Sequence, residues 1–178
     1  LAQAPEVVAV GEVGLDYYRM RAPKDRQTEA FERQIELAAG LGLPQNEAFP
    51  AQLDAVLRAR GTEVTVVNAG VSGDTAVAAL KRLDWALPED ASAVIIELGG
   101  NDALQGIPPE GTKAALAAII EKVQARGLPI LLAGMEAPRN MGKDYMDAFR
   151  ALYADLASRY GVIFYPFFLD GAALNDGL

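Results

Sequence analysis

The feature that most constrains the fold of this chain is an alternation of short apolar runs with longer segments of helical periodicity. The apolar runs are rich in β-branched or aromatic residues, and each is expected to form a strand that is buried on both faces. They comprise residues 7–10, 63–68, 93–98, 129–133 and 162–167. Strands that alternate with helices pair in parallel through crossover connections. We therefore predict an α/β fold of three layers, α/β/α, with a doubly wound, mainly parallel, five-stranded sheet of flavodoxin-like topology.

Between the predicted strands, apolar residues recur at helical spacing and indicate the core faces of amphipathic helices. These faces are Phe31/Ile35/Leu37/Leu41, Leu53/Val56/Leu57, Leu116/Ile119/Ile120/Val123 and Tyr145/Phe149/Leu152/Leu156. Asp74 is suited to cap a helix, and Pro108-Pro109-Glu110 is suited to a first helical turn. Gly61, Gly127 and Gly161 stand where helices should end. We expect one compact domain, with an unusually long front end at residues 15–46 that holds a helix of its own.

The composition narrows the possible partners. With 51% hydrophobic residues the chain can form a real core, and its formal net charge of −8 repels a phosphate backbone. We therefore expect no nucleic-acid partner. The chain contains no cysteine, so it offers neither a disulfide nor a thiolate metal ligand, and the redox compartment stays open. We also expect neither a membrane span nor a signal peptide within these residues, because no apolar segment has the required length and flanks.

Two polar, glycine-rich strings follow the second and third predicted strands. Residues 67–75 read VNAGVSGDT, and residues 97–102 read ELGGND. Ligands of doubly wound sheets bind at the carboxyl ends of the strands, so both strings are expected at the binding edge. Taken singly, Gly73 is typical of a turn before a helix, and Gly99-Gly100-Asn101 is typical of a tight turn at a strand end.

Five motifs in order, GLPQNEAFP, VVNAGVSGDT, ELGGNDAL, LLAGMEAPRNMG and FYPFFLDG, resemble the SGNH hydrolases. The resemblance extends over residues 42–178 and is to the arylesterase and acyl-CoA thioesterase branch. It implies a hydrolase of small acyl esters or thioesters that needs no cofactor or metal and works in a periplasmic or secreted setting. It also implies that Gly73 and Asn101 form an oxyanion hole, whose donors lie about 3 Å from the developing charge.

The same resemblance implies that two catalytic groups of the family are absent from these residues. The family's Ser nucleophile aligns with Val13 when the first strand is matched, or with Glu36 when the Gly-Leu-Pro turn is matched. Asp176 takes the place of the family's Asp, with Asp170 as a second candidate, and the 178 residues contain no histidine. A Ser nucleophile normally needs a base, most often imidazole. We therefore expect hydrolysis to be impaired or absent, and a noncatalytic acyl-binding domain is an alternative.

Residues 7–44, VVAVGEVGLDYYRMRAPKDRQTEAFERQIELAAGLGLP, resemble the TatD-type metal-dependent deoxyribonucleases. In that resemblance Glu12 corresponds to a metal-binding Glu, but the family's site also requires histidines. Glu12 and Asp16 alone seldom suffice for a catalytic ion, so we expect a solvated loop pair and no metal site. The two resemblances meet at residues 37–44. We interpret the chain as a chimera, in which residues 1–44 replace the first block of a hydrolase domain at residues 45–178; a nuclease remnant is the third alternative.

The chimera hypothesis makes a further structural prediction about the sheet. Residues 7–10 are the only candidate for the first, central strand of the hydrolase domain. If they dock there, Glu12 and Asp16 come to lie at the edge of the active site. Their negative charge would then disfavour the oxyanion. Hydrolysis would be hindered by this charge as well as by the lack of a nucleophile and a base.

Overall fold

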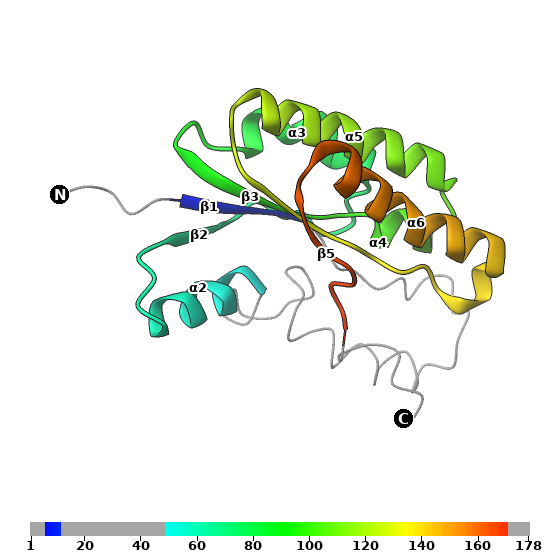
Figure 1. Cartoon of the computed structure of the whole chain (residues 1–178), viewed down its shortest axis with the longest axis horizontal. Coiled ribbons are helices and arrows are strands. Elements are labelled where there is room, and N and C mark those ends of the chain that lie inside the picture. Colours follow the sequence, from blue (N-terminus) through cyan, green and yellow to red (C-terminus); the bar gives the residue numbers. More distant parts are fainter. Residues whose placement is uncertain (1–5, 12–48, 171–178) are drawn as a thin grey trace.

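A computed structural model describes the backbone of residues 6–11 and residues 49–170 in full. Within these residues, five parallel strands form one sheet in the order β2-β1-β3-β4-β5 (Figure 1). The strands are β1 (Glu6–Gly11), β2 (Thr65–Asn68), β3 (Ala91–Glu97), β4 (Ile130–Ala133) and β5 (Ile163–Tyr165). This is the doubly wound, flavodoxin-like order. The predicted parallel sheet, including a central first strand, is confirmed.

Helices cover both faces of the sheet. They are α2 (Phe49–Ala59), α3 (Ala76–Ala86), α4 (Gly100–Leu104), α5 (Pro109–Ala125) and α6 (Lys143–Tyr160), with a short 3₁₀ helix, η2 (Arg139–Met141). Figure 1 shows α3, α5 and α6 on one face and α2 on the other, so the predicted three layers are confirmed. None of the helices in the described ranges has the length and apolarity to cross a membrane. The predicted front end at residues 15–46, including the Phe31 helix face, lies outside the described residues.

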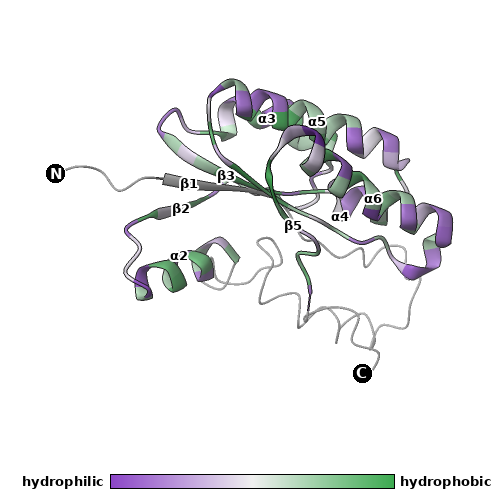
Figure 2. Ribbon diagram, viewed as in Figure 1, coloured by the Kyte–Doolittle hydropathy of each residue, from purple (hydrophilic) through white to green (hydrophobic). Residues whose placement is uncertain are grey.

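The main core lies between strands β3 and β4 and the helices α3, α5 and α6. Leu116, Ile119, Ile120 and Val123 of α5 are completely buried, as their helical spacing predicts. Burying an aliphatic side chain of this size stabilises a fold by about 1.5–3 kcal/mol. Figure 2 shows the matching pattern of hydropathy, since α5 and α6 each carry hydrophobic and hydrophilic positions along their length. The face predicted for α6 is also confirmed, because Phe149, Leu152 and Leu156 are buried.

The expectation that every strand is buried on both faces is wrong at the margin of the sheet. Ile163 and Tyr165 of β5 are 67% and 46% exposed. The reason is position, because β5 is an edge strand with a single neighbour, β4. On the opposite face of the sheet, Val56 of α2 is 47% exposed, so the predicted core face of that helix is also only partly correct.

The helix termini agree with the sequence except at one position. Helix α5 begins at Pro109, and α6 ends at Gly161 in the left-handed conformation, with φ of 62°. The cap of α3, however, is Thr75, whose Oγ1 accepts a hydrogen bond from the Ala78 amide at 3.3 Å. The predicted cap, Asp74, forms an ion pair with Arg82 of α3 instead. The cap prediction was therefore wrong by one residue.

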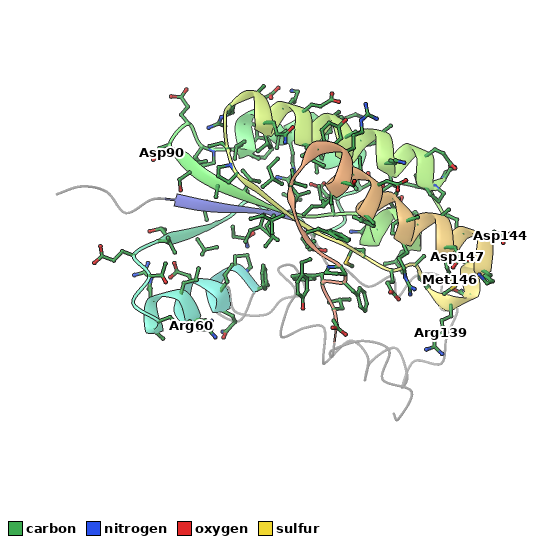
Figure 3. All side chains as sticks on the ribbon, in the orientation of Figure 1. Arg60, Asp90, Arg139, Asp144, Met146 and Asp147 are labelled. Carbon is green, nitrogen blue, oxygen red and sulfur yellow. The ribbon has the colours of Figure 1, made fainter. Side chains whose placement is uncertain are left out.

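Charged side chains labelled in Figure 3 lie at the periphery of the molecule. Arg60 follows α2, Asp90 precedes β3, and Arg139, Asp144 and Asp147 belong to η2 and the first turns of α6. All five are exposed. The polar side chains near the carboxyl edge of the sheet are different residues, and they are buried: Arg82, Asn101, Asp102 and Thr112.

Candidate functional site

The carboxyl end of β1 lies between the two glycine-rich strings. Ala9 of β1 pairs with Asn68 at the end of β2, and Gly11 pairs with Glu97 at the end of β3. The segment that leaves β1 therefore starts between the loops that carry Gly73 and Asn101. This is the edge at which doubly wound sheets bind their ligands.

Gly73 lies in an exposed turn that connects β2 to α3. Its φ of 86° is in the left-handed region, and a Cβ added there would meet no atom of the described residues within 4 Å. The turn is closed by a hydrogen bond from the amide of Asp74 to the carbonyl of Val71, at 3.2 Å. The backbone conformation thus favours glycine at position 73, and the part of the chain that the structure describes leaves space beside it.

Asn101 connects this turn to the end of β3. It lies in α4, directly after Gly99 and Gly100, and its side chain is buried. Its Nδ2 donates a hydrogen bond to the carbonyl of Asp74, at 3.1 Å. The structure therefore brings Asn101 against the residue that follows Gly73, so the two residues predicted from the sequence lie in one site.

Asp102, the next residue along, joins three helices. Its side chain is completely buried, and Oδ2 accepts a hydrogen bond from the amide of Ala76, the first residue of α3, at 2.9 Å. Oδ1 accepts a hydrogen bond from the hydroxyl of Thr112 in α5, also at 2.9 Å. Because Asp102 belongs to α4, its carboxylate links the three elements around the site.

Arg82 supports the Gly73 turn from within α3. Its Nε pairs with the carboxylate of Asp74, and Nη1 donates to the carbonyl of Ala69 at 2.7 Å. The two charged side chains are only 10% and 13% exposed. Arg82 therefore holds both the start and the end of the turn, Ala69 and Asp74, against the helix.

Tyr153 of α6 packs beneath the turn that carries Gly99. Its hydroxyl donates to the carbonyl of Leu98 at 2.9 Å, and a Cβ at Gly99 would overlap that hydroxyl. Burial raises the pKa of Tyr153 well above 10, and the negative charges of Glu97 and Asp102 raise it further. Tyr153 is thus held as a neutral hydrogen-bond donor, and Gly99 is the residue that leaves room for it.

Other residues singled out in the sequence lie elsewhere. Val13, Glu36, Glu12, Asp16 and Asp176 lie outside the described residues. Asp170 is exposed, and its amide donates to the carbonyl of Phe167 at 3.1 Å in the turn after β5. Within the described part of the chain, no group of three or more acidic side chains is placed to hold a metal ion.

Three residues of the site were not identified from the sequence. Asp102 had a signal, since it directly follows Asn101 in the string ELGGND. Arg82 and Tyr153 had no local sequence signal, because a basic residue on a helix is normally solvated and a helical tyrosine is normally a core residue. Their roles depend on contacts to Asp74 and Leu98, which only the fold brings close.

The N-terminal segment matches exonucleases over a short stretch. The 3'-5' ssDNA/RNA exonuclease TatD of Erwinia billingiae is 52% identical over 44 residues, which is 25% of this chain and 17% of the exonuclease. A match of that extent covers a small part of either protein. It therefore does not define the fold of this chain.

Several longer matches are to esterases and thioesterases. Esterase TesA of Pseudomonas aeruginosa is 38% identical over 143 residues, covering 80% of this chain and 71% of the esterase. The thioesterase 1/protease 1/lysophospholipase L1 of Escherichia coli is 37% identical, covering 78% of this chain and 66% of that protein. The crystal structure of AlinE4, an SGNH-hydrolase family esterase, superposes with a TM-score of 0.79 at 34% identity, covering 99% and 82% of the two chains.

The sequence profile of the GDSL-like lipase/acylhydrolase family matches residues 36–178, which is most of the chain. The sheet order, the glycine-rich strings at its carboxyl edge and the relatives that match most of this chain agree with this result. This chain belongs to the GDSL-like lipase/acylhydrolase family.

Proposed function

We propose that this chain has the binding site of an ester and thioester hydrolase, with an oxyanion hole formed by the Gly73 amide and the Asn101 side chain. The observation that carries the proposal is the 3.1 Å hydrogen bond from Asn101 Nδ2 to the Asp74 carbonyl, which places the Asn101 amide beside the Gly73 turn. The names of its relatives, esterase and thioesterase, support small acyl esters and thioesters as the substrate class.

The chemistry accounts for these residue types. When a nucleophile adds to an ester carbonyl, the oxygen becomes negative and is stabilised by preorganised N–H donors about 3 Å away. A glycine at the first donor lets the reacting group approach the backbone without a side chain in the way, and the space that the described residues leave beside Gly73 supports this. Asp176 is proposed as the carboxylate that would orient a histidine base.

We further propose that the 178 residues do not turn over esters. They contain no histidine, and the two candidate nucleophile positions hold Val13 and Glu36. The family profile starts its match at Glu36, whereas the central position of β1 favours Val13, which follows Gly11 by two residues. We favour Val13, because the nucleophile loop of this fold follows the first strand. Neither valine nor glutamate is the nucleophile that this mechanism requires.

The front end is proposed to derive from another gene. Residues 1–44 take the place of the first hydrolase block, and the short match to TatD exonucleases supports this origin. Sequencing the parent locus on both sides tests the proposal. We expect no Gly-Asp-Ser block upstream in the same frame, and finding one intact would overturn the chimera. Cleavage of single-stranded DNA that depends on magnesium or manganese would instead support a functional nuclease remnant.

A noncatalytic acyl-binding domain is the second candidate. It is favoured by one observation, namely that the Asn101–Asp74 contact is present although these 178 residues contain no histidine and hold no serine at positions 13 and 36. The loops that contain Gly73, Asn101 and residues 135–141 would then line the acyl site. If the purified chain retains a medium-chain fatty acid and Asn101→Ala weakens this binding, the chain is an acyl-binding domain. Absence of binding would show that it is not.

Hydrolysis of p-nitrophenyl acyl esters tests the proposed function on the chain as it is. We expect the release of p-nitrophenol to equal that of a buffer blank, and Asn101→Ala to leave it there. A rate clearly above the blank that Asn101→Ala lowers would refute the loss of turnover and support the oxyanion hole. A rate above the blank that Asn101→Ala leaves unchanged would contradict the oxyanion hole itself.

A further inference from the structure

We propose that Asp102 is a positioning residue that sets the placement of Gly73 relative to Asn101. The inference rests on the proposed oxyanion hole and assigns the group that holds its two donors in place. It concerns a buried carboxylate whose two oxygens accept hydrogen bonds from α3 and α5.

The first argument is the cost of burying this group. Asp102 is completely buried, and a buried carboxylate is strongly destabilising unless its oxygens accept hydrogen bonds. Both oxygens do so, from the Ala76 amide and from the Thr112 hydroxyl. Because the buried carboxylate needs both hydrogen bonds, it constrains the positions of Ala76 and Thr112.

The second argument is the pair of contacts made by consecutive residues. Asn101 donates to the carbonyl of Asp74, and Asp102 accepts from the amide of Ala76, two residues further along the same segment. Two bonds from neighbouring residues fix both the distance and the orientation of that segment, whereas one bond would let it pivot. Gly73 precedes the segment directly and is fixed with it.

The third argument concerns the start of α3. The first amides of a helix lack partners within the helix, and a negative charge there is favourable. Thr75 satisfies the Ala78 amide, and Asp102 satisfies the Ala76 amide. The carboxylate therefore contributes to the cap of α3 from another helix, which ties the position of the Gly73 turn to α4.

The fourth argument is the anchoring of the carboxylate itself. Thr112 is completely buried in the first turn of α5, and its hydroxyl bonds to Oδ1 of Asp102. This second bond fixes the rotation of the carboxylate, so that Oδ2 faces Ala76. Preorganised donors depend on supporting residues of this kind, because a displacement near 1 Å already weakens a site.

Nuclear magnetic resonance of the full chain tests the proposal without requiring activity. In Asp102→Ala we expect the Gly73 backbone amide and the Asn101 side-chain amide to shift, and the Ala76 amide to exchange about tenfold faster or more, as for loss of a bond to a charged acceptor. Asp102→Asn should retain the parent positions, because its carbonyl can still accept from Ala76 and its amide can donate to the Thr112 hydroxyl.

Val123→Ala is the matched control for a general loss of stability. Val123 is completely buried in the same helix as Thr112, about 16 Å further along its axis. We expect this variant to leave the Gly73 and Asn101 resonances in place. If Asp102→Ala moves them no more than Val123→Ala does, the positioning role is overturned.

Thr112→Val keeps the test decisive if Asp102→Ala does not fold. It removes only the hydroxyl that fixes the carboxylate, and Thr112→Ser retains that hydroxyl. We expect Thr112→Val to shift the Gly73 and Asn101 resonances and Thr112→Ser to leave them, and equal behaviour of the two would refute the role. These spectra do not depend on hydrolysis, so failure of the positioning role and failure of the oxyanion hole are separate results.

Discussion

The guanidinium of Arg82 and the carboxylate of Asp74 form a buried ion pair beneath the turn that carries Gly73. Arg82 also donates to the carbonyl of Ala69 at 2.7 Å, so that one side chain closes both ends of the turn. Breaking such a pair by removing one partner leaves an uncompensated buried charge, which is strongly destabilising.

We therefore expect Arg82→Met to lower the free energy of unfolding by about 3 kcal/mol. Lys122→Met is the control, because the Lys122–Asp84 pair is 46% and 80% exposed. That change should cost less than about 1 kcal/mol. Urea denaturation measures both, and equal losses would show that the Arg82 pair is not a buried support.

Gly99 provides the space that Tyr153 occupies. In Gly99→Ala the new methyl group would overlap the Tyr153 hydroxyl, and φ of 110° is itself unfavourable for alanine. We expect a loss of about 3 kcal/mol, from overpacking and backbone strain together. Gly127 also has a positive φ, but a Cβ there would meet no described atom within 4 Å, so Gly127→Ala should lose only about 1 kcal/mol. Similar melting temperatures for the two variants would contradict the packing argument.

The buried phenol of Tyr153 should make stability sensitive to alkali. Its pKa is raised above 10 in the folded state, so its contribution is fully present below pH 10 and is lost as the pH rises toward the folded value. Near neutral pH, Tyr153→Phe should lower the free energy of unfolding by about 1 kcal/mol, because the hydrogen bond to the Leu98 carbonyl is lost. Above pH 10 the free energy of unfolding of this variant should decline less steeply than that of the parent.

Tyr165→Phe is the control for the alkaline experiment, since Tyr165 is 46% exposed. It should follow the parent curve of unfolding free energy against pH. A Tyr153→Phe curve that runs parallel to the parent above pH 10 would show that Tyr153 does not carry the effect.

Asp54 joins α2 to the edge strand β2. The hydrogen bond from the Val66 amide, at 3.0 Å, and then the Arg58 side chain lower the pKa of Asp54 below 3.8. Its contribution is therefore present above that value and is lost as the pH falls through the folded pKa. We expect Asp54→Ala to speed hydrogen exchange at Val66 near neutral pH, with the difference from the parent disappearing in strong acid.

Asp155→Ala removes an exposed carboxylate that pairs with Lys113 and serves as the matched control. Exchange at Val66 should be unchanged by it. A difference between Asp54→Ala and the parent that persists at the lowest pH would contradict the assigned role of the ionised carboxylate.

The fold was predictable because each buried element has a local signature. Ile119 and Ile120 recur at helical spacing, and the apolar run at residues 93–98 is long enough to identify β3. The exposure of Ile163 was not predictable from its own run, because β-branched residues look alike in edge and central strands. Only the sheet order, which places β5 at the margin, distinguishes them.

The candidate site was predictable only where its residues stand in local sequence motifs. Gly73 and Asn101 stand in ordered motifs, and the structure brings their segments together through the Asp74 carbonyl. Tyr153 contacts Leu98, which is 55 residues away in the sequence, and Arg82 reaches back to Asp74 across the start of α3; neither contact has a local sequence pattern. Asp102 could have been suspected from its place beside Asn101, but its two partners follow only from the packing of α3 against α5.

The most direct measurement is the rate of p-nitrophenyl ester hydrolysis by a chain in which the missing groups are restored. That chain carries Val13→Ser and a histidine placed directly after Leu178, and it is compared with the same chain carrying Glu36→Ser instead. We predict turnover above the parent with Val13→Ser, and a fall of about 100-fold when Asn101→Ala is added. No turnover in either restored chain, or turnover that Asn101→Ala leaves unchanged, would contradict a retained oxyanion hole at Gly73 and Asn101.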